Sequence, residues 1–550
     1  MNRYKQAFLH FFRHRGYTAA VLLTALCSFG TTFFQVTIGR DSLEGGRYIG
    51  DGHVMITTGR FGMNFWARFL GYGEAGPAYA PAINLLAALL LVLAAAAFCV
   101  LLRKICGDRI SMFGYGLFSC LFISYPLINE IWEYAGANVC VSGGYLLDAL
   151  ALNCLYDLLH EPQLTRGQKL GRILTTLFGL TIVCSSYESL AAVFVLGVFA
   201  VLTLEQLFST QKLPLNRVIL HGCFYAAALA AGLVLRMVLQ FLLPAVLQVS
   251  AAAGTVNGET ELQWLAMPLR EVLRWLVRNF IIYYGMRGCF YLPILEFAAA
   301  LAVFLVLLAA VVFVRKRPGM LLTGAGMLLS LVLLALVQGT YSPYRTCQTF
   351  ALFVALTALA LYEVIRAKTH RAGLLWVVQA LAVLLCLRQA VYLNHLLVLD
   401  HQRSEEEAAV VRSIGTELEQ NYDTDKPVVI TGIYTLSSSI TQEVTANAAD
   451  SALYRAFQQK TGWETEETIR FVDSNCNSVL SWAVGAFREE GTYGSAMEKL
   501  FAYYGFPLQL EHSATLHAQA MAYREANPMP AYPAQGSIVD CGTYILVNLG

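Results

Sequence analysis

A cluster of charged residues directly after the first apolar segment contains the residue types that a group-transfer reaction needs. Within twenty-one residues the chain carries three carboxylates and three arginines: Asp41, Glu44 and Asp51, and Arg40, Arg47 and Arg60. A carboxylate fixed at a membrane surface can accept a proton from a hydroxyl nucleophile, and arginines can hold a phosphate leaving group through paired N–H donors. The segment therefore contains residues for both tasks of a transfer reaction, accepting the proton and holding the leaving group. The alternative is a solvated loop with ordinary ion pairs.

A second basic region extends over residues 262–284. Arg270, Arg274 and Arg278 recur every four residues between large apolar side chains, which predicts a helix lying in the outer headgroup layer. Ordinary headgroup anchoring and capture of a lipid-linked phosphate explain this pattern equally well. Arg345 adds a further guanidinium at a Pro-containing turn.

The composition shows which kind of scaffold must position these residues. The 550 residues are 57% hydrophobic and 14% charged, whereas soluble chains carry about 25% charged residues. The chain is therefore a polytopic membrane protein. Lys plus Arg is 38 and Asp plus Glu is 37, so no bulk charge favours nucleic acid.

Apolar segments of about 20 residues are long enough to cross the hydrocarbon core. Eleven such segments are predicted, at residues 17–39, 79–102, 110–128, 139–159, 172–186, 188–206, 218–243, 289–314, 320–338, 348–365 and 374–397. The fifth and sixth are separated by the polar break Ser185 to Ser189. Joined as one helix they would be about 52 Å long, too long for a core of about 30 Å.

The basic residues of the connecting loops predict the orientation. One set of loops carries eighteen Lys and Arg, six of them Lys, while the opposite set carries nine Arg and no Lys. The first set is expected to face the cytoplasm. Residues 1–16 are then cytoplasmic, and loop 40–78 and residues 399–550 lie on the external face. Loop 40–78 includes a short amphipathic helix at 59–70, which could equally be an interfacial anchor.

Four ionisable residues lie inside predicted spans, all in the outer half: Asp148, Arg236, Glu296 and Arg388. Intramembrane charges cost at least about 2.5 kcal/mol unless they are paired or hydrated. A polar cavity open to the outside and two structural ion pairs explain them about equally well.

The last part of the chain, residues 399–550, has the pattern of a small α/β domain. Helices are predicted at 404–422, 446–460, 464–471 and 493–504, a strand at 427–432 and a hairpin from 536 to 548. Cys476 and Cys541 could pair there, which the sequence alone leaves open. No nucleotide-binding or metalloprotease motif occurs in it.

The layout resembles the bacterial glucosyltransferases typified by prophage serotype-converting O-antigen glucosyltransferases. The resemblance rests on the charged loop with Asp41, on Gly59-Arg60-Phe61-Gly62, on Ser186-Tyr187-Glu188-Ser189 and on an α/β tail ending in Gly536-Ser537-Ile538. It implies a GT-C-type fold for residues 17–398, a lipid-phosphate-linked sugar as donor and a cell-envelope glycan as acceptor. It also implies an acidic catalytic base in the first external loop, which maps onto Asp41, with Glu44 and Asp51 as alternatives. Glu188 stands where the family pattern has Gln, and could contribute a carboxylate.

These observations predict an integral-membrane glycosyltransferase of the bacterial inner (cytoplasmic) membrane, transferring glucose from a polyprenyl-phosphate donor on the outer face. The substrate-binding candidates are Arg40, Arg47, Arg60, Glu188, Arg270, Arg274 and Arg345. No motif assigns a metal site, and a divalent cation such as Mg or Mn stays an open alternative for the reaction. A transporter or flippase of lipid-linked sugars and a non-catalytic envelope assembly factor are the other functions compatible with this layout.

Overall fold

The computed structural model describes most of the chain. The residues outside the description are 1, 40–42, 44–54, 57, 72–76, 133–135, 209–213, 249–263, 265–266, 275, 278–290, 315, 340–343, 370, 435, 438–442, 448–458, 461–467, 473–477, 481–494 and 511–512.

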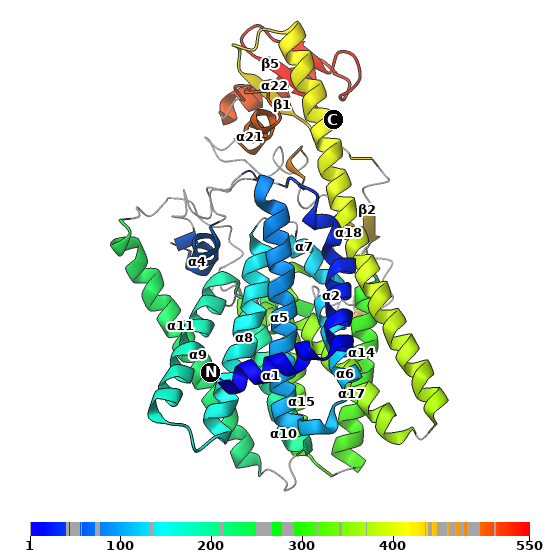
Figure 1. The fold of residues 1–550 in the computed structure, drawn as a ribbon. Coiled ribbons are helices and arrows are strands. Elements are labelled where there is room, and N and C mark those ends of the chain that lie inside the picture. The colour runs from blue at the N-terminus through cyan, green and yellow to red at the C-terminus, as the bar shows by residue number, and fades with distance from the viewer. Residues whose placement is uncertain are drawn as a thin grey trace.

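A bundle of long helices forms the larger part of the protein (Figure 1). Its helices are α1 (Asn2–Arg13), α2 (Arg15–Phe29), α4 (Phe61–Leu70), α5 (Ala80–Cys106), α6 (Met112–Ile123), α7 (Asn129–Trp132), α8 (Ala137–His160), α9 (Arg166–Ser186), α10 (Leu190–Phe208), α11 (Leu215–Val246), α14 (Tyr291–Ala309), α15 (Gly319–Leu331), α16 (Leu333–Gln338), α17 (Thr349–Lys368) and α18 (Ala372–Asn421). Single turns join them at η1 (Gly30–Phe33), η4 (Pro77–Tyr79), η5 (Gly107–Arg109), η6 (Pro126–Ile128), η8 (Ala310–Val314) and η9 (Tyr344–Thr346).

Among the described residues, nine helices are long and apolar enough to cross a membrane: α2, α5, α6, α8, α10, α11, α14, α17 and α18. The other two predicted spans are also helical, as α9 and α15. α9 falls outside the nine because Arg166, Lys169 and Arg172 in its first two turns lower its hydropathy. α15 falls outside because it has only 13 residues. The helices support a membrane protein, and the count of eleven crossings stays a prediction. The predicted break at Ser185 to Ser189 is confirmed, since α9 ends at Ser186 and α10 begins at Leu190.

Local signals set the ends of these helices. Thr165 caps α9, and Gln168 returns a side-chain contact to the Thr165 backbone, so that two otherwise free N–H groups are satisfied. α5 has a proline in its first turn, basic Arg103 and Lys104 in its last turn, and Gly107 after it with φ +63°. Proline is favoured in the first turn of a helix, and basic residues and a following glycine are favoured at its C-terminal end.

The main apolar core lies where α5, α6, α8 and α10 pack against α2 and α17. Ala94 to Ala97 of α5 are fully buried, because small side chains let neighbouring helices approach closely. α11, by contrast, is buried over only a small part of its length, so most of its apolar surface faces outward.

The C-terminal part contains a three-stranded sheet in the order β1-β5-β4, formed by β1 (Val428–Thr431), β4 (Ile538–Asp540) and β5 (Ile545–Asn548). β1 pairs parallel with β5, and β4 pairs antiparallel with β5, which confirms the predicted terminal hairpin. Side chains alternate between two faces. One face packs on α18 and α21 (Ser495–Tyr503), and the other packs on α22 (Ala514–Ala526).

The helices predicted at 446–460 and 464–471 are corrected only where strands replace them, at residues 446–447 and 468–471. Residues 459–460 are helical, and residues 448–458 and 461–467 lie outside the described residues. β2 (Glu443–Asn447) and β3 (Thr468–Val472) form an antiparallel pair, in which Val444 lies opposite Phe471. The segments are rich in β-branched residues, and cross-strand pairing satisfies their backbone groups, so the strand preference prevails over the 3.6-residue pattern. Cys476, the predicted alternative partner of Cys541, lies outside the described residues.

α18 connects the two parts of the chain as one uninterrupted helix of 50 residues. Figure 1 shows it running along the bundle and continuing beyond it to the sheet. It is therefore about 75 Å long, more than twice a hydrocarbon core. The predicted helix at 404–422 is the C-terminal part of α18, which ends at Asn421.

α4 packs so closely against the end of α9 that only glycine fits at position 62. A Cβ atom on Gly62 would lie 2.5 Å from the hydroxyl of Ser186 and 2.7 Å from the carbonyl oxygen of Ile182. This close approach holds α4 against the turn between α9 and α10.

We expect Gly62→Ala to lower the free energy of unfolding by about 1–3 kcal/mol, the usual cost of overpacking. The matched control is Gly171→Ala in α9, where nothing lies within 4 Å of the added Cβ. That change should be neutral or slightly stabilising, because alanine favours a helix over glycine. Thermal unfolding of the purified protein in detergent measures both, and equal melting of Gly62→Ala and wild type would contradict the close approach.

Candidate functional site

Arg60 and Glu188 form a two-point ion pair at the end of the bundle where α4 lies. Arg60 Nε donates to Glu188 Oε1 at 3.2 Å, and Arg60 Nη2 donates to Glu188 Oε2 at 3.3 Å. Arg236 of α11 approaches the same carboxylate, with Nη2 at 3.8 Å from Oε1. Arg236 Nε also donates to the carbonyl oxygen of Gly59 at 3.2 Å. Three segments far apart in the sequence therefore meet at one carboxylate.

The electrostatics of this group favour an anionic ligand. Burial disfavours the charged form of Glu188, but the neighbouring Arg60 guanidinium outweighs it and holds the pKa of Glu188 below its usual value. Glu188 is thus ionised at neutral pH, and two guanidinium groups share its single charge. The excess positive charge suits a phosphate, for which arginine provides paired donors.

Glu130 and Arg345 form a second ion pair beside the first. Arg345 Nη1 donates to Glu130 Oε1 at 2.8 Å, and the Arg345 backbone N–H donates to Glu130 Oε2 at 2.7 Å. Burial raises the pKa of Tyr187 to about 12, and the charges of Arg345, Glu130, Arg60 and Glu188 all act on that phenol. Glu130 was missed by the sequence reasoning. The sequence did contain a signal for it: Glu130 lies just after the predicted span 110–128, and an acid at the end of an apolar span needs a cation as partner.

Buried polar groups without a partner gather in the same elements. Within the described part of the chain, buried polar atoms of these residues have no hydrogen-bond partner: Trp66 in α4, Trp132 in α7, Ser142 and Asp148 in α8, and Ser186 and Ser189 at the α9–α10 turn. An unsatisfied buried group costs about 1–3 kcal/mol, and native proteins keep few of them. Other such atoms occur elsewhere in the described part of the chain, for example in Ser28, Thr176 and Tyr225, so these groups alone do not mark a site.

The four intramembrane charges do not form the two simple pairs that were one of the alternatives. Arg236 pairs with Glu188 rather than Asp148. Asp148 is fully buried, and neither of its carboxylate oxygens has a partner among the described residues. Glu296 and Arg388 interact electrostatically, but no ion pair within 4 Å joins them in the part of the chain described.

The segment entering loop 40–78, which is predicted to be external, is held by α18. The backbone N–H of Ile38 donates to Ser404 Oγ at 2.9 Å, and Arg403 Nη2 donates to the carbonyl oxygen of Ile38 at 2.9 Å. Leu43, within the loop, packs against the same apolar cluster as Ile38, a cluster built from α18, β1 and β5. Both residues flank Asp41 in the sequence.

Arg403 is the centre of a buried charge network. Its side chain is 0% exposed, Nε donates to Asp400 Oδ1 at 2.7 Å, and Nη1 donates to Glu407 Oε2 at 2.6 Å. Glu407 also accepts from the Ser478 hydroxyl and from the Leu480 backbone N–H. One arginine thus joins the start of the first loop to the C-terminal part of the chain.

The structure brings together only some of the predicted site residues. Arg60 and Glu188 meet, and Arg345 adjoins them through Glu130 and Tyr187. Arg270 is exposed, and Arg274 pairs loosely with Glu271 at 3.7 Å on the helical segment that includes residues 269–274. Five predicted residues lie outside the described residues: Arg40, Asp41, Glu44, Arg47 and Asp51.

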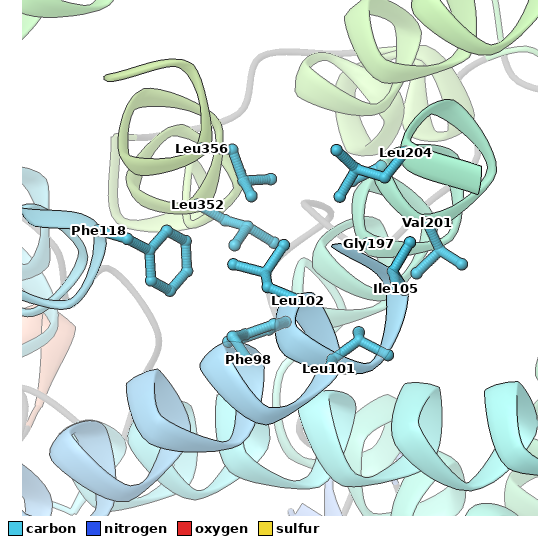
Figure 2. A pocket seen from close by; sticks show the side chains of 11 residues that line it. Phe98, Leu101, Leu102, Ile105, Phe118, Gly197, Val201, Leu204, Leu352 and Leu356 are labelled. Carbon is cyan, nitrogen blue, oxygen red and sulfur yellow. The ribbon is translucent and has the colours of Figure 1, made fainter. Parts of the chain in front are cut away.

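The pocket shown in Figure 2 is not suited to a sugar or a phosphate. Apolar side chains of α5, α6, α10 and α17 line it, together with Gly197, and no polar side chain does. It is a packing feature of the main core.

A known protein family matches the part of the chain that contains Arg60, Glu188 and Arg236. Residues 30–284 match the family model described as Glucosyl transferase GtrII. The matched region contains the whole first external loop and the residues Arg60, Glu188 and Arg236. The resemblance to serotype-converting glucosyltransferases is therefore confirmed over this region, and it supports glycosyltransferase activity. No curated protein and no solved structure matches the chain.

The Arg60–Glu188 pair should show measurable energetic coupling. A double-mutant cycle with Arg60→Gln and Glu188→Gln is expected to give about 0.5–1 kcal/mol, a modest value because the two side chains remain 29% and 28% exposed. The native pKa of Glu188 is lowered, so the coupling should be constant above about pH 5 and vanish as the pH falls through that pKa. The control is the Glu271–Arg274 pair, which is more exposed and should couple less. Additive single mutants would contradict the pairing.

Arg403→Met should destabilise the protein strongly. It leaves Asp400 and Glu407 buried without their cation, a situation that typically costs about 3–5 kcal/mol. Lys426→Met removes the exposed Lys426–Asp540 pair instead and should cost at most about 1 kcal/mol. Chemical unfolding in detergent compares the two, and equal small losses would show that the Arg403 network is not a stabilising element.

Proposed function

We propose that the protein is an integral-membrane glycosyltransferase that transfers a hexose, glucose by family resemblance, from a polyprenyl-phosphate donor to a cell-envelope glycan. The observation that carries this proposal is the meeting of Glu188 and Arg236 with Arg60, a residue of the same predicted loop, 40–78, as Asp41, Glu44 and Asp51. This group lies inside the region that matches the GtrII family. The proposed catalytic part is residues 17–398, and residues 399–550 form an accessory α/β domain.

In the proposed reaction, an acceptor hydroxyl oxygen attacks the anomeric carbon of the donor sugar. The new glycosidic bond forms while the bond between that carbon and the phosphate oxygen breaks. The hydroxyl proton passes to a loop carboxylate, Asp41 by preference, and the electron pair leaves with the polyprenyl phosphate. Arg60 and Arg236 carry the surplus positive charge that would stabilise the departing phosphate.

The proposed site of reaction is the outer face of the bacterial cytoplasmic membrane. Lys104 and Arg172 both contact Asp157, and Arg366 donates to the carbonyl oxygen of Arg109, so basic residues of three predicted cytoplasmic loops gather at the end of the bundle away from α4. The positive-inside rule then puts α4 and the first loop outside, where a lipid-linked donor and a glycan acceptor could meet.

Asp41→Asn tests the proposed base. Purified protein is incubated with polyprenyl-phosphate glucose and a glycan acceptor, and release of polyprenyl phosphate is measured. We expect kcat to fall about 10²–10⁴-fold, with KM nearly unchanged, because the carboxylate acts in the transition state. Glu44→Gln and Asp51→Asn are the matched controls and should retain most of the rate.

Two outcomes would overturn parts of this proposal. A full rate in Asp41→Asn together with a large loss in Glu44→Gln or Asp51→Asn would move the base to that residue. If folded wild-type protein released no lipid phosphate from any polyprenyl-phosphate sugar, the glycosyltransferase proposal would fail. Movement of the labelled lipid across a vesicle membrane would then support a flippase.

A further inference from the structure

A second cluster of chemically active side chains lies at the other end of the bundle. His160 ends α8, Glu205 lies in the last turn of α10, and His221 lies near the start of α11. Their ligand atoms all lie within 4.8 Å of one another. Gly143 of α8 contacts α4 through Trp66, and His160 lies seventeen residues further along that helix, about 25 Å away at helical rise.

The contacts within this cluster place acceptor atoms face to face. His160 Nδ1 lies 2.9 Å from the carbonyl oxygen of Tyr156, which has no proton to donate, so Nδ1 must be the protonated nitrogen. In a neutral imidazole, Nε2 then carries a lone pair. That atom lies 3.1 Å from Glu205 Oε1, which is buried and also an acceptor. Two facing acceptors at this distance require a proton or a metal cation between or beside them.

Two of the distances are close to those of a tetrahedral metal site, with the two histidines approaching different oxygens of Glu205. Ligands at 2.0–2.1 Å from a zinc ion in tetrahedral geometry are about 3.3 Å apart. His160 Nε2 lies 3.1 Å from one oxygen of Glu205, and His221 Nδ1 lies 3.2 Å from the other. The carbonyl of Tyr156 fixes the ring of His160, as partners of metal-binding histidines commonly do.

We propose that His160, Glu205 and His221 bind one divalent transition-metal ion, with zinc as the best fit. Two imidazoles and one carboxylate suit zinc rather than magnesium or calcium, which prefer oxygen ligands. The three residues come from three helices, so the ion joins the ends of α8, α10 and α11. Its distance from Arg60 and Glu188 makes it a structural site, separate from the proposed transfer reaction.

Metal binding to the purified full-length protein tests this proposal. Tag-free protein in detergent is stripped with chelator and then dialysed against Zn²⁺, and bound metal is measured by mass spectrometry. We expect one zinc per chain in wild type and a loss of at least tenfold in affinity in His160→Ala, His221→Ala and Glu205→Gln. The matched control is His395→Ala on α18, an exposed histidine outside the cluster, which should keep the ion.

A spectroscopic arm needs no variant and is unaffected by a folding defect. Co²⁺ bound to stripped wild type should give the intense visible absorption of a tetrahedral site, and Zn²⁺ should displace it and raise the melting temperature. Mn²⁺ and Mg²⁺ should do neither. The proposal is overturned if wild type binds no zinc, if cobalt gives only the weak octahedral spectrum, or if all three variants keep the metal. In those cases a proton shared between His160 and Glu205 accounts for the contact.

Discussion

The two ends of the stretch 38–60 are fixed by hydrogen bonds, most of them to charged groups, and the arrangement of the proposed site depends on this constraint. At the start, Arg403 and Ser404 hold both backbone polar groups of Ile38. At the end, Arg236 holds the carbonyl oxygen of Gly59, and Arg60 is held by Glu188. Hydrogen bonds that involve a charged group contribute more than neutral ones, about 1.5–3 kcal/mol in buried settings.

The distribution of charge at the second of these ends explains why it can be both stable and reactive. Glu188 alone would not tolerate its location, because burial disfavours the ion, and either arginine alone would leave no spare positive charge. With two guanidinium groups on one carboxylate, the folded protein keeps an ionised Glu188 and a net positive charge. An incoming phosphate would complete the neutralisation. The same group can therefore be part of the fold and of the ligand site.

The sequence predicts the apolar helices well, because hydropathy is a local property. Hydropathy marks the helices, and the polar residues from Ser185 to Ser189 mark the break between α9 and α10. The partners of the charges could not be predicted in the same way. Glu188 meets Arg60 across 128 positions, and Arg345 meets Glu130 across 215, so the pairs depend on how the helices pack.

Two other differences between the predicted elements and the structure have local causes. The end of β2 and most of β3 were predicted as helix because a short segment can satisfy a helical pattern by chance, whereas the pairing partner that makes it a strand lies over twenty residues away. The continuity of α18 was recognisable in part, since no Gly or Pro interrupts residues 374–414. The change from an apolar to an acidic surface near residue 400 suggested a boundary, although helix propensity continues through it.

The continuity of α18 has a mechanical consequence. Arg403 and Glu407 lie one turn apart on a helix, the first contacting Ile38 and the second contacting Ser478 and Leu480. Because an uninterrupted helix is stiff over one turn and the Arg403–Glu407 contact is fully buried, the two attachment points cannot move independently at low cost. A shift of the segment around Ser478 to Leu480 relative to α18 would therefore either break the hydrogen bonds to the buried Glu407 or move the Arg403–Ile38 contact. The fold thus makes the position of Ile38, two residues before the charged segment, depend on a domain that carries no recognised catalytic motif of its own.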